Sequence, residues 1–385
     1  MAQYRLPAVF MRGGTSKGLV LHRRDLPDDR REWDRLFLGA LGSPDPYGRQ
    51  LDGMGGGLSS LSKICVVGPP SRADADIDYT FAQVMIASSH VDYQPLCGNM
   101  SSVVGPFAVD EGLISADGDL ARVRIHNTNT QKIIVATFGL EDGRAAVDGD
   151  LEIPGVAGTG APLRLDFMDP GGASTGRLLP TGKEQEWLDV PGYGPIRASM
   201  VDASNACVFV LAADLGLSGH EMPAQLDGDT VLMNRLAAIR IAASLRMGLA
   251  TDAGQARAQT AVPFIAFVAP PASFSTLSAS THTDSDVDLI ARVISNGQAH
   301  RALPLGVSMC MAVAARIEGT VVHQAARQPQ AGPADLRLGM PSGVLQVAAT
   351  VCREGGAWRA VQGGFYRTQR RLFEGAVLVR GSALR

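Results

Sequence analysis

The strongest constraint on the fold is an order of features that occurs twice in the chain. In the first half RGGTSKGLVL runs into HRRDLP, and in the second half VDASNACVFV runs into AADLG. Further along each half a long apolar segment follows a small polar start, LCGNMSSVVGPFAVDEGL first and LPLGVSMCMAVAARIEGT later. The shared order of polar turn, strand and buried helix favours two related halves, although any strand or buried helix could supply the apolar parts alone.

Length and composition agree with two domains built mainly from strands. A chain of 385 residues exceeds what one hydrophobic core usually serves. Its 44 glycines and 22 prolines, with only 5% aromatic residues, indicate tight turns between short elements and favour strands over long helices. The turn-rich segment 180–194 is the expected boundary, so we predict domains over 1–185 and 186–385, with the last strand able to cross back to the first domain.

Charge, cysteine content and missing motifs exclude several classes of protein. Thirty-eight acidic residues against 35 basic ones, without a basic stripe, argue against a nucleic-acid partner. Five scattered cysteines without a C-x-x-C pair argue against a disulfide framework or structural zinc and favour the cytoplasm. The chain shows no signal-peptide pattern, and its most apolar stretch, 261–267, is short and is followed by Pro270 and Pro271, so we expect no membrane association. Dinucleotide and metalloprotease motifs are missing, so we expect no cofactor and no metal.

Cys97 is the first candidate catalytic residue. The apolar spacing after it predicts a buried helix that starts near Asn99, which puts the thiol at the helix N-terminus. First-turn N–H groups and the helix dipole favour a thiolate, which could act as base, acid or nucleophile near neutral pH. An inert buried cysteine is the alternative, although Gly98 and the hydroxyls of Ser101 and Ser102 suit an anion site. The remaining cysteines lie in apolar runs and are expected in the core: Cys65, Cys207, Cys310 and Cys352.

Lys63 is the second candidate. It interrupts the apolar run 58–67 at the point where the glycine-rich segment LDGMGGGLSS enters a predicted strand. Partial burial there would favour the neutral amine and make the side chain a plausible acid or base. The alternative is a lysine at the end of a strand whose ammonium group reaches water.

Three polar segments could bind the carboxylate groups of a small anionic substrate: residues 12–17, residues 57–60 and the predicted helix start at 99–102, which Gly98 precedes. The first of them lacks the complete phosphate-loop pattern and precedes a strand, so nucleotide binding is discounted. The candidate substrate-binding residues from these segments are Arg12, Thr15, Ser16, Lys17, Ser59, Ser60, Gly98, Asn99, Met100 and Ser101.

Six motifs together resemble the PrpF family of cofactor-independent isomerases, and they span nearly the whole chain. They are RGGTSKG, LDGMGGGLSSLSK, CGNMSS with GPFAVDEGLI, HRALPLGVSMCMAVAARIEGT, MPSG and YRTQRRLFEG. The resemblance implies an α+β fold like that of diaminopimelate epimerase, in which two similar domains each form an antiparallel β-barrel around a central helix. Three positions depart from the family pattern and bear on substrate identity: Leu96, Met340 and Gln369.

The resemblance also implies a reaction. It is a 1,3-allylic proton shift in an unsaturated di- or tricarboxylic acid of the aconitate, methylaconitate or oxalomesaconate type, without a cofactor, with Lys63 and Cys97 as the catalytic pair. Backbone donors at Asn99 and Met100 and at Ser308 and Met309 could stabilise the dienolate charge. The expected partner is a small polycarboxylate, and a homodimer stays open.

Two alternatives stay open from the sequence. An amino-acid racemase or epimerase on the same fold is disfavoured, because the second half has no thiol at the position equivalent to Cys97 and the nearest one is Cys310. A carboxylate-binding protein without catalytic activity is the other alternative.

Overall fold

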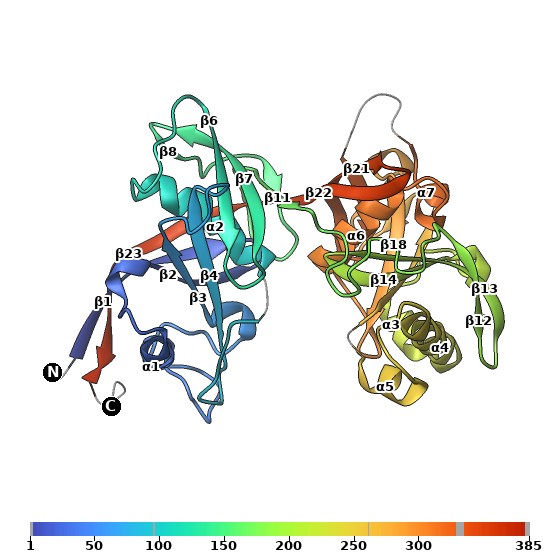
Figure 1. Ribbon diagram of the computed structural model, residues 1–385, viewed down its shortest axis with the longest axis horizontal. Helices are drawn as coiled ribbons and strands as arrows, with labels where there is room; N and C mark the ends of the chain where they lie inside the picture. Colours follow the sequence, from blue (N-terminus) through green and yellow to red (C-terminus); the bar gives the residue numbers. More distant parts are fainter. Residues whose placement is uncertain (1–2, 95–96, 261, 329–334, 382–385) are drawn as a thin grey trace. The chain divides into compact units, whose positions relative to one another are not determined.

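The computed structural model describes residues 3–94, 97–260, 262–328 and 335–381 (Figure 1). The chain forms two compact units, of which the first comprises Met1–Phe167 and Tyr366–Arg385 and the second comprises Met168–Phe365. The second unit is therefore inserted between two pieces of the first. The boundary expected from the sequence, between 185 and 186, lies later in the chain than this division.

The first unit consists of strands around one central helix (Figure 1). Its helices are α1 (Trp33–Leu41) and α2 (Gly98–Asp110), with short 3-10 turns η1 (Arg23–Asp25), η2 (Arg30–Glu32) and η3 (Ser59–Leu61). Its strands are β1 (Gln3–Gly13), β2 (Ser16–His22), β3 (Lys63–Gly68), β4 (Ile77–Val84), β5 (Val91–Asp92), β6 (Leu120–Asn127), β7 (Lys132–Glu141), β8 (Arg144–Ala145), β9 (Leu151–Glu152), β10 (Thr159–Gly160), β11 (Leu163–Met168) and β23 (Gln369–Arg380).

Helix α2 is apolar on all sides because strands surround it. Every residue from Met100 to Val109 is buried, and the helix packs against β1, β2, β3, β4, β6, β7, β8 and β23. A helix that is apolar all round belongs in a core. At Gly105 a Cβ atom would lie 2.8 Å from the ring of Phe138, so only glycine allows β7 this close to the helix.

The second unit has its own central helix, α6 (Leu305–Ala315), which is buried from Val307 to Ala315. The other helices are α3 (Pro223–Gly228), α4 (Thr230–Arg246), α5 (Ala253–Ala258) and α7 (Val321–Ala325), with turns η4 (Ala213–Leu215) and η5 (Asp284–Asp286). The strands are β12 (Glu186–Val190), β13 (Gly194–Ala203), β14 (Asn205–Leu211), β15 (Phe264–Ala269), β16 (Phe274–Ser275), β17 (Thr281–His282), β18 (Leu289–Ser295), β19 (Gln298–Ala299), β20 (Leu336–Met340), β21 (Gly343–Glu354) and β22 (Ala357–Arg367).

Strand pairing follows the same order in both units, so the repeat inferred from the sequence is present in the topology. In the first unit β1–β2 is antiparallel, β2–β3 parallel, β3–β4 antiparallel, β4–β6 parallel and β6–β7 antiparallel. The pairs β13–β14, β14–β15, β15–β18, β18–β20 and β20–β21 have the same succession of directions. The strands are therefore mixed rather than purely antiparallel as expected, because a helical connection joins the partners of each parallel pair.

Helices also cover the outer face of the strands in each unit. Trp33, Leu36 and Phe37 of α1 share a core with the outer side of β1, β2, β3 and β4. Leu232, Leu236 and Ile239 of α4 share another with strands of the second unit. Segment 180–194, expected to be turns, contains β12, because Leu188 and Val190 alternate with exposed residues and point into that core.

Candidate active site

Cys97 caps the N-terminus of α2. Its backbone is extended, and its Sγ accepts a hydrogen bond from the backbone N–H of Met100 at 3.5 Å. The carbonyl of Cys97 accepts both the backbone N–H of Ser101 at 2.9 Å and the Ser101 hydroxyl at 3.0 Å. The half-buried thiol thus lies against first-turn N–H groups, which have no partner within a helix and favour a negative charge.

The turn between β1 and β2 lies directly on this helix start. At Gly13 a Cβ atom would lie 2.4 Å from the carbonyl oxygen of Asn99 and 2.8 Å from the Ser102 hydroxyl. The Asn99 side-chain amide donates to the Thr15 hydroxyl at 3.0 Å. Gly14, with φ of 51°, occupies the left-handed region that the tight turn requires. Two segments proposed from the sequence to bind carboxylates are therefore adjacent in the first unit.

Arg367 joins this cluster, and sequence reasoning did not select it. Its Nε donates to Oδ1 of Asn99 at 3.1 Å across 268 residues of sequence, and its Nη1 donates to the Tyr366 carbonyl at 2.6 Å. Burial lowers the pKa of the Arg367 guanidinium to about 10, while the nearby Cys97 acts in the opposite direction. The motif YRTQRRLFEG pointed to this segment, but no sequence signal indicates that Arg367 lies beside the helix start.

Arg12 bonds to the backbone of the turn, whereas Lys17 lies outside the turn. Nη1 of Arg12 donates to the carbonyls of Gly14 and Thr368, both at 3.1 Å, and to the Thr368 hydroxyl at 3.0 Å. Burial, and to a smaller extent Arg370, lowers the pKa of Arg12. Lys17 lies in β2 rather than in the turn, with its Nζ 5.6 Å from the centre of the Phe10 ring, and Ser16 is buried.

Lys63 is buried at the start of β3, with a relative exposure of 7%. Its Nζ donates to Oε1 of Gln83 at 2.6 Å and lies 5.1 Å from the centre of the Phe81 ring. The alternative left open by the sequence, an ammonium group that reaches water at the end of a strand, is therefore wrong. Ser59 and Ser60 lie in η3, just ahead of β3, with Ser59 exposed and Ser60 half-buried.

Cys65 is influenced by both candidate catalytic residues. It lies two residues after Lys63 on the same face of β3, and its thiol is 3.8 Å from the Tyr79 hydroxyl. Burial raises the pKa of Cys65, and both Cys97 and Lys63 lie close enough to act on it as well. Burial also raises the pKa of Tyr79, with Cys65 and Cys97 adding to the effect. Lys63 and Cys97 therefore share one neighbourhood in the first unit.

Helix α6 in the second unit repeats the geometry of α2 without a thiol. Pro304 occupies its N-cap, and Ser308 donates its backbone N–H and its hydroxyl to the Pro304 carbonyl at 2.9 and 3.1 Å, as Ser101 does to Cys97. The Ser308 backbone N–H is thus used within the helix, because the helix begins at Leu305 and this group closes its first turn, and a role of Ser308 in substrate binding stays a prediction. Met309 is buried and packs against Gly363.

Two of the three positions that depart from the family pattern are described by the structure, and both are buried. Met340 is buried, and its Sδ accepts the backbone N–H of Leu303 at 3.4 Å, so it supports the segment that leads into α6. Gln369 is buried in β23, opposite Gly13 of β1. Leu96 lies outside the described residues.

The other thiols divide into two groups. Cys65, Cys207 and Cys310 are buried, whereas Cys352 is exposed. The expectation of a core position for Cys352 is therefore wrong, because the end of β21 runs beyond the core and residues 352–354 face solvent. In the part of the chain that the structure describes, no three His, Cys, Asp or Glu residues are grouped so that they could hold a metal ion.

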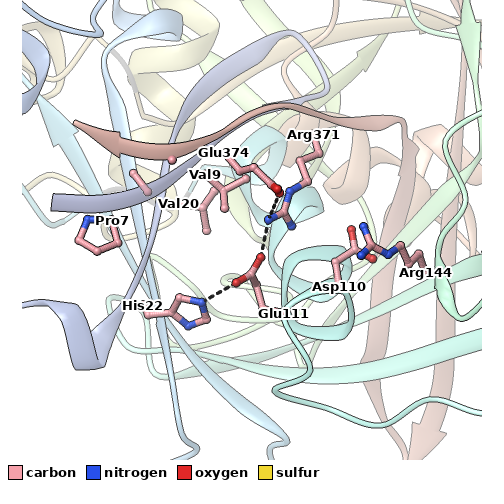
Figure 2. A pocket seen from close by; sticks show the side chains of 11 residues that line it. Pro7, Val9, Val20, His22, Asp110, Glu111, Arg144, Arg371 and Glu374 are labelled. Atoms are coloured by element: carbon pink, nitrogen blue, oxygen red, sulfur yellow. Dashed lines mark hydrogen bonds and ion pairs between the residues drawn. The ribbon is translucent and has the colours of Figure 1, made fainter.

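A cavity of about 500 Å³ lies in the first unit at the opposite end of α2 (Figure 2). Figure 2 shows His22, Glu111 and Arg371 pointing toward one another: Glu111 accepts from His22 at 2.9 Å and pairs with Arg371, which also pairs with Glu374 at 2.8 Å. None of the residues predicted from the sequence lines this cavity. Its charges largely neutralise one another, so the start of α2, with its thiol, buried amine and guanidinium, remains the candidate active site.

Among the described residues, no helix is both long and apolar enough to cross a bilayer.

Comparison with known proteins points to one family over nearly the whole length of the chain. The model of the family described as PrpF protein matches residues 3–380. The chain is 42% identical to 3-methylitaconate isomerase of Eubacterium barkeri, over 99% of each chain. It is 38% identical to 2-methyl-aconitate isomerase of Shewanella oneidensis, over 98% of this chain and 97% of that one. It is 35% identical to 4-oxalomesaconate tautomerase of Pseudomonas putida, with the same coverage.

The fold has a solved counterpart. The structure of methylitaconate-delta-isomerase superimposes with a TM-score of 0.94 at 40% identity, over 100% of this chain and 98% of that one. A hydroxyproline epimerase, 11% identical with a TM-score of 0.50, shares the general fold over 99% of this chain and 93% of that one. The α+β, epimerase-like class expected from the sequence is therefore confirmed.

Proposed function

The chain belongs to the PrpF family and is an isomerase, and we propose that it moves a carbon–carbon double bond by a 1,3-allylic proton shift in an unsaturated di- or tricarboxylic acid. The relatives named for methylitaconate, methylaconitate and oxalomesaconate support this substrate class. The observation that carries the assignment of residues is that Lys63 and Cys97 both lie near enough to the Cys65 thiol to influence its pKa.

In the proposed reaction one of these two groups removes a proton from the carbon beside a carboxylate. The electrons of that C–H bond form the new double bond, and the electrons of the old double bond take a proton from the second group at the far allylic carbon. Atoms balance and no carbon is oxidised or reduced. The dienolate that forms is anionic, and in this proposal the N–H groups at the start of α2 and the guanidinium of Arg367, which donates to Asn99 there, stabilise it.

The second unit supports an asymmetric pair of catalytic groups. Lys63 is the first residue of β3, and the equivalent first residue of β15 is Phe264; Cys97 caps α2, and Pro304 caps α6. A racemase that relies on one thiol from each half lacks its second thiol here. We therefore propose that both proton-transfer groups come from the first unit.

Deuterium exchange tests the reaction. Incubation in deuterated water with trans-aconitate, methylaconitate, methylitaconate or oxalomesaconate should introduce deuterium at an allylic carbon of at least one acid. Label at a carbon that bears an amine, with proline-type amino acids as substrates, would indicate a racemase. No exchange with any of these compounds would favour a binding protein and contradict the proposal.

Replacement of Lys63 tests its role. Lys63→Met should keep the fold but lower turnover by at least about 100-fold, the lower end of general acid–base contributions. Lys183→Met is the matched control, because the Lys183 side chain is mostly exposed in the second unit. Near-normal turnover in Lys63→Met would remove Lys63 from the mechanism.

The proposal also covers the cellular compartment of the enzyme and its oligomeric state. All five thiols are free, which suits a reducing compartment, and we place the enzyme in the cytoplasm. The homodimer left open by the sequence is decided by sedimentation of the purified protein.

A further inference from the structure

Gln83 lies directly opposite Lys63 in the antiparallel pair of β3 and β4. Its side chain is buried, with a relative exposure of 9%, and its Oε1 accepts the Lys63 Nζ at 2.6 Å. The amide Nε2 donates to the carbonyl of Ser62 at 2.9 Å and to that of Ser59 at 3.1 Å. One side chain thus ties the candidate acid–base group to the turn that precedes its own strand.

These contacts allow one orientation of the Gln83 amide. With Nε2 on the two carbonyl oxygens, both of its N–H groups have acceptors and Oε1 faces the lysine. The flipped amide would set its oxygen against two carbonyl oxygens and its NH₂ group against the ammonium form of Lys63, which has only donors. Both contacts would be repulsive, so the backbone carbonyls of Ser59 and Ser62 fix the acceptor that Lys63 meets.

The neutral amide suits a group that must change its protonation state. An amide oxygen accepts an N–H from an ammonium and from a neutral amine alike, whereas a carboxylate would favour the ammonium alone. The Phe81 ring, two residues before Gln83 on the same face of β4, lies 5.1 Å from Nζ and limits its position from another direction. Nζ is therefore held in place by a neutral partner and an aromatic ring.

We propose that Gln83 is a positioning residue for proton transfer, which acts through Lys63 by holding Nζ at one position during the proton shift. This inference rests on the proposed function, because it requires Lys63 to be the acid–base group. Because Gln83 acts through Lys63 in this proposal, its removal should lower kcat and leave KM nearly unchanged.

The test uses Gln83→Met, which keeps the length of the side chain but removes the acceptor. Turnover should fall about 10-fold or more, because a misplacement of 1 Å at a reacting group can cost on the order of 100-fold, while KM should stay within about twofold. In a Lys63→Met background the same change should add less than about twofold, since residues that act through one another are not additive. Thr80→Val is the control, because Thr80 lies elsewhere on β4 and the change removes its partly buried hydrogen bond to Thr128.

Each outcome decides the inference. Normal turnover in Gln83→Met, or an equal loss in the Lys63→Met background, would show that Gln83 does not act through Lys63, and the proposed isomerisation would still stand. An unchanged Lys63→Met enzyme, or a wild-type chain inactive on every acid, would instead contradict the proposed function. If Gln83→Met does not fold, Gln83→Asn gives the same comparison, because its shorter side chain cannot reach both Nζ and the two carbonyls.

Discussion

Gly13→Ala probes the contact between the β1–β2 turn and the start of α2. A Cβ atom at this position would lie 2.4 Å from the backbone oxygen of Asn99 and 2.8 Å from Cγ1 of Val103, where ordinary contacts begin at 3.4 Å. The backbone of Gly13 has no positive φ, so strain in its own dihedral angles does not enter. In the folded state the added methyl group therefore acts by pushing the turn and the helix start apart.

The size of the effect follows from that overlap. Restoring normal contact with Asn99 requires a displacement of about 1 Å, and the nearest atom belongs to backbone that cannot rotate away. Overpacking of this kind typically costs about 1–3 kcal/mol of stability. Because Cys97 lies two residues before Asn99, a shift of this size would also misplace the thiol, and turnover should fall by on the order of 100-fold.

Urea unfolding and steady-state kinetics measure the two effects separately. Gly139→Ala is the matched control, because its Cβ would lie 3.6 Å from Ala146, an ordinary contact, and its stability should be unchanged or slightly higher. If Gly13→Ala unfolds at the same urea concentration as the wild type and keeps normal turnover, the close approach of β1 to α2 is not what positions Cys97.

Two further predictions concern the thiol and the opposite end of α2. In a Cys352→Ser background, one equivalent of iodoacetamide near neutral pH should label mainly Cys97 and abolish activity, and trans-aconitate should protect it; even labelling without protection would contradict an anion site at the helix start. Burial acts to raise the pKa of Glu111, but hydrogen bonds from His22 and Arg371 outweigh it and lower the pKa below the ordinary 4.5. The ionised Glu111 carboxylate therefore stabilises the fold above about pH 4.5, and this contribution is lost as the pH falls through the lowered pKa. In urea unfolding, Glu111→Gln should lower the free energy of unfolding by about 1–3 kcal/mol at pH 7 and by much less near pH 3. A cost that does not change with pH would contradict this.

Sequence patterns predicted the elements that are long and buried, such as the two central helices. The segments after Cys97 and Pro304 are long and mostly apolar, so a buried helix could be predicted in each half, and the predicted start near Asn99 lies one residue from the observed one at Gly98. The strand β12 could not, because its five residues contain only two buried apolar positions among turn-forming neighbours. The exposure of Cys352 was missed for a related reason: β21 is longer than the core that covers it.

The active site was predictable only in part, because contacts between distant segments leave no local signal. Cys97 and Lys63 each stand out against their own neighbours, one at a helix start and one in an apolar run. Gln83 looks like any polar residue at the end of a strand until the register of β3 and β4 places it opposite Lys63. Arg367 is 268 residues from Asn99, and only the fold brings its guanidinium to the helix start.

The insertion of the second unit within the first affects the order in which the protein can fold during synthesis. Residues 168–365 are contiguous, so the second unit has all of its chain before the first does. β23, which pairs with β1 along most of its length, leaves the ribosome last among the described strands. The N-terminal part of the chain must therefore wait with β1 unpaired on that side, and the neighbourhood of Cys97 becomes complete only when Arg367 and β23 have been made.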